Sequence, residues 1–220
     1  RTALHWAISN DNIACVRALL EHGSNCTILC SKGNSAFHYA AHIRSPEIMS
    51  VLLTIQSYAT DEEINRENNE GMTPIYIAAG RGNSDTVTLL SHRAAICKPG
   101  PGANTVLHKS ILGGCNLEAI QALVEQGADT LVQNEAGEVP LHLACVSDSN
   151  IDIVQWILQQ SNKYGIINHQ NKQGSTPLHI AAMWDSVMIA NSLLKNGADP
   201  TTKDCDERTA LDIAIAQGNS

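Results

Sequence analysis

Aromatic and charged residues are both scarce in this chain of 220 residues. Only 4% of the residues are aromatic, with a single phenylalanine, and 16% are charged, whereas 43% are hydrophobic. A hydrophobic core must therefore be built from Leu, Ile, Val and Ala. Such a composition suits many short helices packed side by side, and the length allows one large domain or two small ones.

Clusters of basic residues are also missing. The 14 Lys and Arg residues are outnumbered by 22 Asp and Glu residues, which gives a net charge of −8, and no run of basic residues occurs. Nucleic-acid phosphates are bound through clustered Lys and Arg, so the sequence predicts no nucleic-acid partner. An acidic surface would instead attract a basic protein or peptide.

Signals for membrane insertion and for export are absent. No apolar stretch approaches the roughly 18 residues that a transmembrane helix needs, and the first ten residues, RTALHWAISN, are unlike a signal peptide. The seven cysteines include no Cys-x-x-Cys pair, and most lie in apolar helical patterns. We therefore expect reduced, buried thiols in an intracellular protein, cytoplasmic or nuclear, with no direct membrane insertion.

Motifs for catalysis and for metal or cofactor binding are absent as well. The sequence has no Gly-x-Ser-x-Gly, no His-Glu-x-x-His and no P-loop. His22, Cys26 and Cys30 are each four residues apart, but a structural zinc site generally needs four ligands. We expect no enzymatic activity, no cofactor and no metal site in this chain.

A seven-residue motif recurs along the whole chain, as in TPLHIAA at its sixth copy. The copies begin at Thr2, Ser35, Thr73, Thr105, Val139, Thr176 and Thr209, at spacings of 33, 38, 32, 34, 37 and 33 residues. Most copies open with Thr or Ser, which can cap a helix, often followed by Pro, which is favoured at the first helical position. Two short apolar helices follow in each repeat. Isolated helices shorter than about 12 residues are marginal in water, so neighbouring repeats must stabilise them.

The motif resembles the Thr-Pro-Leu-His-x-Ala-Ala signature of the ankyrin repeat, whose period is about 33 residues. The segments CVRALLEHGSN, AIQALVEQGAD and MIANSLLKNGAD are similar to the second helix of that family and its terminal glycine. The resemblance implies an all-α solenoid of stacked helix-turn-helix units with projecting β-hairpin fingers. We expect one ankyrin-repeat domain over residues 1–220, a fragment of a longer protein. Its repeats are expected at about 1–30, 31–68, 69–98, 99–133, 134–170 and 171–204, with part of a seventh at 205–220.

Some repeats depart from the pattern. The second and fifth are long, with extra residues around 57–68 and 161–170, where we expect longer finger loops. In the fourth repeat Pro99 and Pro101 should prevent regular pairing in the finger. In the seventh repeat Cys205, Asp206 and Glu207 stand where a turn glycine is usual.

Histidine occupies the fourth signature position in five repeats. The resemblance implies that each of these histidines bonds backbone groups of the neighbouring finger and ties repeats together. A metal ladder is disfavoured, because Tyr76 and Asp212 take the same position in two repeats. The five residues are His5, His38, His108, His142 and His179.

Ankyrin proteins usually hold a partner against a concave face made of finger tips and the ends of first helices. Carried over position by position, the resemblance implies a protein-binding surface at His42, Ile43, Glu70, Met72, Arg81, Glu135, Glu138, Lys172, Gln173, Met183, Trp184 and Arg208. Trp184 is expected to face outward and to anchor the partner, since Trp and Arg dominate binding hot spots. The alternative is that Trp184 packs on Arg208 or Gln217.

The other two tryptophans are expected in the core. Trp6 is assigned to the leucine position of the signature, and Trp156 lies within a second helix, IVQWIL. A separate hypothesis concerns the acidic residues Asp61, Glu62, Glu63, Glu67, Glu70, Glu135 and Glu138. They would present a negative stripe to a basic peptide, with an affinity that falls as salt rises. The alternative is an ordinary solvated surface.

These features favour a monomeric protein-interaction module, acting as a scaffold or as an inhibitor that masks its target. The number of repeats and their acidity are similar to those of the cytoplasmic inhibitors of Rel-type transcription factors. The alternative is a regulatory segment of a larger multidomain enzyme or ion channel, since ankyrin arrays occur in phospholipases, palmitoyltransferases and channels. A small-molecule sensor would need a basic, aromatic-lined pocket, of which the sequence gives little sign.

Overall fold

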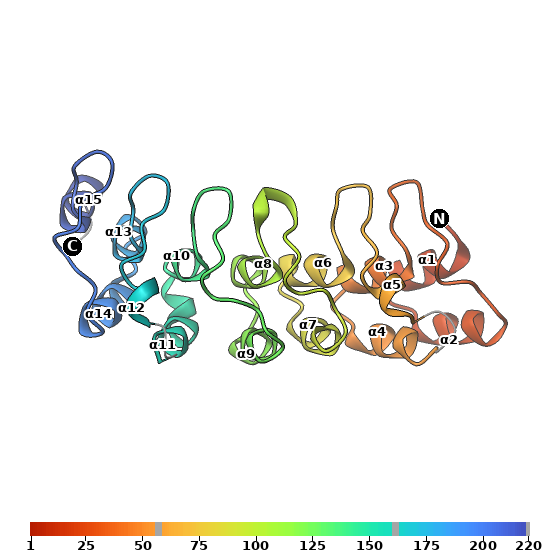
Figure 1. Cartoon of the computed structure of the whole chain (residues 1–220). Helices are drawn as coiled ribbons and strands as arrows, with labels where there is room; N and C mark the ends of the chain where they lie inside the picture. Colours follow the sequence, from red (N-terminus) through yellow and green to blue (C-terminus); the bar gives the residue numbers. More distant parts are fainter. Residues whose placement is uncertain (56–58, 160–162, 219–220) are drawn as a thin grey trace. The chain divides into compact units, whose positions relative to one another are not determined.

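Helices make up the regular structure of the chain. The computed structural model describes residues 1–55, 59–159 and 163–218, and these form helices α1 to α15 and two short 3-10 helices, with no β-strand among them (Figure 1). The predicted all-α class is therefore confirmed. The contacts divide the chain into two compact units, one of residues 1–101 and 105–128 and one of residues 102–104 and 129–220.

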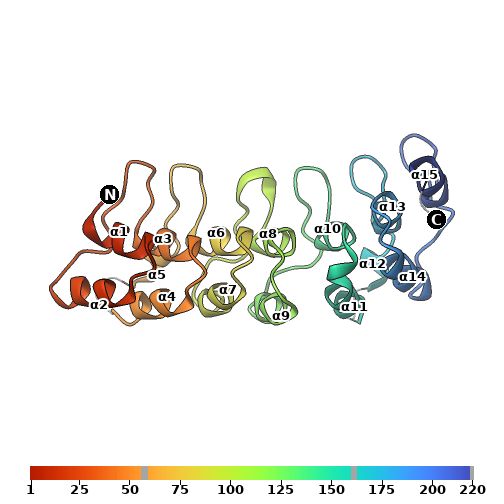
Figure 2. The same cartoon turned by 180° about the vertical axis from the view of Figure 1, so that it is seen from behind.

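The first unit is a stack of four helix pairs. Its inner helices, which begin at the signature, are α1 (Ala3–Ser9), α3 (Ala36–His42), α6 (Pro74–Gly80) and α8 (Val106–Gly113). Its outer helices are α2 (Ile13–Glu21), α4 (Pro46–Leu53), α7 (Ser84–Ser91) and α9 (Leu117–Glu125). Each inner helix contacts the outer helix of its own repeat, and successive inner and successive outer helices contact each other. Figures 1 and 2 show the resulting two rows, with the loops between repeats, the fingers, projecting from the inner row.

The second unit repeats this arrangement. Its inner helices are α10 (Pro140–Ala144), α13 (Pro177–Met183) and α15 (Ala210–Gln217), and its outer helices are α11 (Ile151–Gln159) and α14 (Val187–Lys195). The 3-10 helix η2 (Asp148–Asn150) links α10 to α11. The carboxylate of Asp148 accepts hydrogen bonds from the backbone N–H groups of Met188 (3.2 Å) and Ile189 (3.1 Å), and so caps the first turn of the next outer helix.

Helix starts are fixed by reciprocal bonds between a cap and the signature histidine. At α13 the Thr176 hydroxyl accepts from the backbone N–H of His179, and the Thr176 backbone N–H donates to Nδ1 of the same histidine at 3.1 Å. The inner and outer helices contain only five to nine residues. Helices this short depend on burial against their neighbours, as the repeat pattern predicted.

The third signature position supplies the core of each repeat. Phe37 is fully buried there, and so are its counterparts in the other five early repeats, Leu4, Ile75, Leu107, Leu141 and Leu178. In the last repeat the side chain of Leu211 is 67% exposed, because no described helix covers that face of α15. The third signature position is therefore buried wherever the inner helix is covered by an outer helix and by the next repeat.

The expectation that Trp6 lies in the core is wrong. Leu4 takes the leucine position of the first signature, and Trp6 takes the variable fifth position, where its side chain is 55% exposed. In the first unit this position is exposed or partly buried, whereas in the second unit its residues Leu143, Ile180 and Ile213 are buried. Trp156 on α11 is only partly buried.

The fingers are tight turns rather than the expected β-hairpins. Each of five has two internal backbone hydrogen bonds. The N–H of its first residue donates to the carbonyl four residues further on at 2.9–3.0 Å (30 to 34, 68 to 72, 134 to 138, 171 to 175 and 204 to 208), and the N–H of its fourth residue donates back to the carbonyl of the first at 2.9–3.1 Å. Single backbone bonds also join neighbouring fingers, as from the Asn69 N–H to the Lys32 carbonyl at 3.1 Å. These bonds do not extend into a strand ladder, and no described finger residue is in a strand. Glu207 takes the left-handed conformation (φ 60°) that glycine supplies in the other turns.

The two insertions do not lengthen the fingers as expected. Their described residues instead form short helices, α5 (Asp61–Ile64) and α12 (Lys163–Ile166), ahead of fingers of ordinary size. The remaining insertion residues 57–58 and 161–162 lie outside the described part of the chain. In the fourth repeat, the proline-containing finger forms the 3-10 helix η1 (Pro101–Ala103).

All seven cysteines are free thiols. Four of them are buried and three are exposed, Cys15, Cys97 and Cys205. Among the helices of the described residues, none combines the length and the apolar character required to cross a bilayer.

Candidate functional site

Three of the five signature histidines join successive repeats, as the resemblance implied, whereas Nε2 of His5 is buried with no hydrogen-bond partner among the described residues. In three repeats Nε2 lies 3.1 Å from a finger carbonyl of the next repeat: His38 from Met72, His142 from Ser175 and His179 from Arg208. In the same rings Nδ1 accepts a hydrogen bond from the cap backbone N–H. The ring must therefore be the neutral tautomer with the proton on Nε2, which donates to the finger carbonyl.

Burial keeps the imidazoles of His38 and His142 neutral. It lowers the pKa of His38 to about 4, against the smaller opposing effect of the Met72 carbonyl. Burial also lowers the pKa of His142. The histidines therefore fix the position of the fingers, and their role is structural.

The free energy of unfolding should fall as the pH drops below neutral. Below about pH 6.5 the unfolded chain protonates His38, whereas the folded chain does not until about pH 4. The unfolded state then binds more protons, so stability falls, by about 2 kcal/mol between about pH 7.5 and pH 5 from His38 alone. Urea titrations at both pH values would measure this loss, and His38→Gln should reduce it. Equal pH slopes for the two proteins would contradict this account of His38.

A groove runs between the fingers and the inner helices of the first unit. It consists of two hollows of about 340 and 330 Å³, which share Lys32, Asn34, His42 and Ile77. Five residues predicted to bind a partner come together in it: His42, Ile43, Glu70, Met72 and Arg81. We call this feature the finger groove. Its lining residues come from Arg1, from two neighbouring fingers and from α1, α3, α6 and α8.

The floor of the finger groove contains side chains that the sequence reasoning did not select. Tyr39, Ile77 and Lys109 occupy the fifth signature position of the second, third and fourth repeats, and each is partly buried along the groove. The Lys109 ammonium lies 5.8 Å from the centre of the Tyr76 ring. These residues could have been found from the sequence. The fifth signature position changes from aromatic to aliphatic to charged between repeats, as no other signature position does.

Positive charge predominates in the finger groove. Arg1, Lys32, Arg81 and Lys109 line it, and Glu70 is the one carboxylate among its described lining residues. His42 adds no charge at neutral pH, because burial and the neighbouring Arg81 lower its pKa.

In the first unit, three of the five carboxylates of the expected negative stripe are in ion pairs. These pairs join Arg93 with Asp61 (2.8 Å), Lys98 with Glu67 (2.7 Å) and Arg66 with Glu63. Asp61, Glu62 and Glu63 belong to α5, outside the finger groove, whereas Glu70 lines it. Of the stripe residues in this unit, Glu62 and Glu70 are the two that no ion pair holds among the described residues.

In the second unit, several of the predicted residues are strongly exposed. Trp184 is the C-cap of α13 with 59% of its side chain exposed, and the adjacent Met183 is also exposed. The prediction that the end of this helix faces outward is confirmed. The Arg208 guanidinium is bound by Asp204 (2.9 Å) and Asp206 (2.8 Å).

The remaining finger residues of this unit differ in their exposure. Glu135, Lys172 and Gln173 point to solvent, whereas Glu138 is partly buried and accepts a hydrogen bond from Asn134 at 3.0 Å. Glu138 and Arg208 therefore contribute to the finger structure itself. Glu135, Lys172 and Gln173 are exposed, as are Met183 and Trp184, and these side chains are available to a partner.

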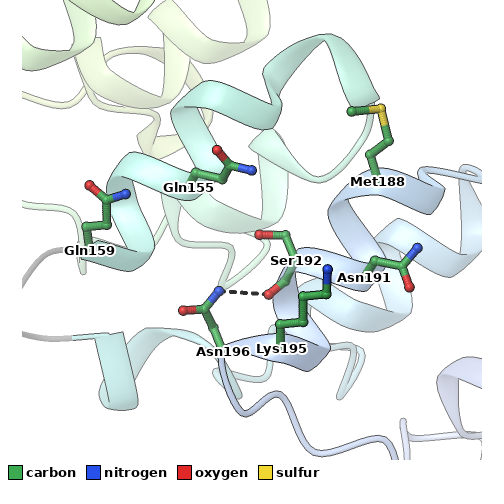
Figure 3. A pocket seen from close by; sticks show the side chains of 7 residues that line it. All are labelled: Gln155, Gln159, Met188, Asn191, Ser192, Lys195 and Asn196. Carbon is green, nitrogen blue, oxygen red and sulfur yellow. Dashed lines mark hydrogen bonds between the residues drawn. The ribbon is translucent and has the colours of Figure 1, made fainter.

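Two further hollows lie away from the fingers of the second unit. One, of about 320 Å³, lies between α11 and α14 and is lined by Gln155, Gln159, Met188, Asn191, Ser192, Lys195 and Asn196 (Figure 3). Its amide side chains are spread over the two outer helices, and the bond drawn there joins Asn196 to the Ser192 carbonyl within α14. The other, of about 440 Å³, is apolar and lies among α13, α14 and α15. Neither brings catalytic groups together.

Within residues 1–55, 59–159 and 163–218, no three His, Cys, Asp or Glu side chains come together as metal ligands. His22, Cys26 and Cys30 accordingly do not converge.

Comparisons with known proteins point to one family. A family model described as "Ankyrin repeats (3 copies)" matches residues 1–62, 50–134, 91–166, 107–204 and 165–220. Palmitoyltransferase ZDHHC13 of Homo sapiens is 29% identical over 155 residues, which are 69% of this chain and 24% of that protein. The B-cell lymphoma 3 protein homolog of Mus musculus is 28% identical over 175 residues, 78% of this chain and 38% of that protein. The chain thus spans well under half the length of these relatives.

Solved ankyrin domains have the same fold. The ankyrin repeat domain of human ASB11 superposes with a TM-score of 0.81 at 22% identity, covering 97% of this chain and 92% of that one. The ankyrin repeat domain of Bcl-3, described as a member of the IkappaB protein family, gives a TM-score of 0.73 at 25% identity, covering 97% and 94%.

Proposed function

Because this chain belongs to the ankyrin-repeat family, we propose that it is a protein-interaction module that binds its partner on the fingers and inner helices. The observation that supports this most strongly is the finger groove. Its floor is formed by Tyr39, Ile77 and Lys109 at the fifth signature position, while the third position supplies the core of the same repeats. In the first unit the fifth position is exposed or partly buried, so its side chains can differ between repeats without loss of the core and can specify a partner.

The chain acts by binding rather than by catalysis in this proposal, as a scaffold or as an inhibitor that masks its target. Its exposed anchors in the second unit are Trp184 and Met183, residue types that are enriched at protein interfaces. An intracellular site of action, cytoplasmic or nuclear, is part of the same proposal.

A second candidate is a regulatory ankyrin segment within a larger enzyme. It is favoured by the match to 24% of the length of a palmitoyltransferase. Binding through the finger groove is common to both candidates.

Capture of partners from a cell extract would test the proposal. The bait is the whole chain, compared with a variant in which His42 and Met72 are both replaced by Glu. The matched control replaces Thr54 and Leu89 by Glu, because these residues line a hollow on the outer helices of the same unit. We expect the groove variant to lose partners that the wild type and the outer-helix variant both retain.

The opposite pattern would overturn the proposal. If the outer-helix variant lost the partners and the groove variant kept them, with both variants folded by circular dichroism, the binding surface would lie on the outer helices. The proposal would also be contradicted if the wild type captured no protein whose binding is lost in one of the two variants.

A further inference from the structure

The cations of the finger groove have no acidic partners of their own. Lys32 lies at a finger tip, Arg81 caps α6, and Lys109 projects from α8, and no ion pair involves any of them in the described part of the chain. Arg81 does contact the His42 ring, which takes up one of the five N–H donors that a guanidinium carries. With Arg1 included, four cations face one carboxylate, a local excess of three positive charges.

This excess is opposite in sign to the net charge of the whole protein, which is −8. In the same unit Arg66, Arg93 and Lys98 are each in an ion pair with a neighbouring carboxylate, whereas Arg17 and Arg44 are in none among the described residues. Neighbouring like charges repel one another, and an anionic ligand would relieve that repulsion.

Apolar and aromatic side chains lie between the cations. Tyr39 and Ile77 line the hollow next to Lys32, and Met72, Tyr76 and Ile77 line the one that contains Arg81. A ligand for this surface therefore needs acidic groups and at least one apolar side chain between them. An extended protein segment provides both, since alternate side chains along it point to opposite faces.

We propose that the finger groove binds an acidic, extended segment of the partner protein, with carboxylates at Lys32 and Arg81 and an apolar side chain over Tyr39 and Ile77. This inference rests on the proposed function and names the chemistry of the partner. It is the reverse of the basic partner that the net charge alone suggests. Nucleic acid is the poorer ligand, because its closely spaced phosphates would meet the net negative charge of the rest of the chain.

Fluorescence anisotropy with defined probes tests this proposal. The probe is a labelled peptide of about ten residues, glutamates interspersed with leucine and tyrosine, which spans about 33 Å when extended. Comparison probes are the same peptide with lysine for glutamate, a single-stranded DNA oligonucleotide and labelled ATP. We expect the acidic peptide alone to bind, with an affinity that falls as salt rises.

The variants are matched in charge. Reversal of two groove cations, Lys32→Glu with Arg81→Glu, should weaken binding of the acidic peptide by about tenfold or more. Reversal of two outer-helix cations, Arg17→Glu with Lys195→Glu, changes the net charge equally and should leave affinity within about twofold. Neutralisation with Lys32→Gln and Arg81→Gln is the fallback should the reversed variant fail to fold, and the same loss is expected.

The outcomes separate the two levels of the proposal. Equal losses in the groove and outer-helix variants, or binding of the lysine peptide, DNA or ATP in preference to the acidic peptide, would overturn the acidic segment. If the acidic peptide does not bind, but cellular partners are still lost on His42→Glu with Met72→Glu, the inference fails and the proposed function stands. If the acidic peptide does not bind and no cellular partner is lost in that variant, the inference and the proposed function both fail.

Discussion

Replacing Phe37 with alanine is expected to lower the free energy of unfolding of the first unit by about 3–5 kcal/mol. Phe37 is the one phenylalanine of the chain, and its side chain is completely buried at the third signature position of α3. That helix packs against α1, α4 and α6. The substitution removes a large ring from contacts with several helices at once. None of these short helices is stable without them.

Urea denaturation followed by circular dichroism would measure this effect, with Tyr39→Ala as the matched control. Tyr39 lies two residues further along the same helix, but it faces the finger groove and is only partly buried. We expect it to cost about 1 kcal/mol. A loss below about 1 kcal/mol for Phe37→Ala, or equal losses for both variants, would contradict the assignment of the core to the third position.

Replacing Trp184 with alanine is expected to weaken binding of a protein partner about 30-fold, which corresponds to about 2 kcal/mol. The indole is 59% exposed at the C-cap of α13 and borders the exposed side chain of Met183. An exposed tryptophan contributes little to folding, but it buries a large apolar area when a partner covers it. The melting temperature should therefore hardly change.

Calorimetric titration of a captured partner into the wild type and the variant would test this expectation. Met188→Ala is the control, because Met188 is similarly exposed (56%) but lies on the outer helix α14. It should not alter the affinity. A large fall in melting temperature with unchanged affinity for Trp184→Ala would assign the indole to packing instead.

The repeat architecture is predictable from the sequence because it depends on local signals that recur. Thr or Ser caps, the following proline and the histidine at the fourth position recur at nearly constant spacing, and the structure places a helix start at each copy. The histidine bonds to the next finger follow from the same regularity. One repeat therefore predicts the local geometry of the others.

Features that break the repeat could not be predicted in this way. The acidic insertion was expected to lengthen a finger, but it forms α5, where Thr60 caps the helix and Arg93 from the following repeat bonds Asp61. That ion pair joins residues 32 positions apart, so no local pattern reveals it. The pairing of Asp61, Glu63 and Glu67 was not foreseen for the same reason, because sequence shows which residues are acidic and not which are paired.

The composition of the finger groove was predicted in part. The positions at the end of a first helix and at the finger tips identified His42, Arg81, Glu70 and Met72. The charge of the groove was not foreseen, because Lys32 and Lys109 are 77 residues apart by their numbering and become neighbours only when three repeats stack. The net charge of the chain therefore gave the wrong sign for this surface.

Hydrogen–deuterium exchange of the chain, alone and bound to a captured partner, tests the central claim most directly. The claim is that the partner covers the fingers and the exposed ends of the inner helices. We predict slower exchange on binding at the finger residues 30–34 and 68–72 and around Arg81, with no change in the outer helices α2, α4 and α7. Slower exchange in those outer helices, with the fingers unchanged, would contradict it.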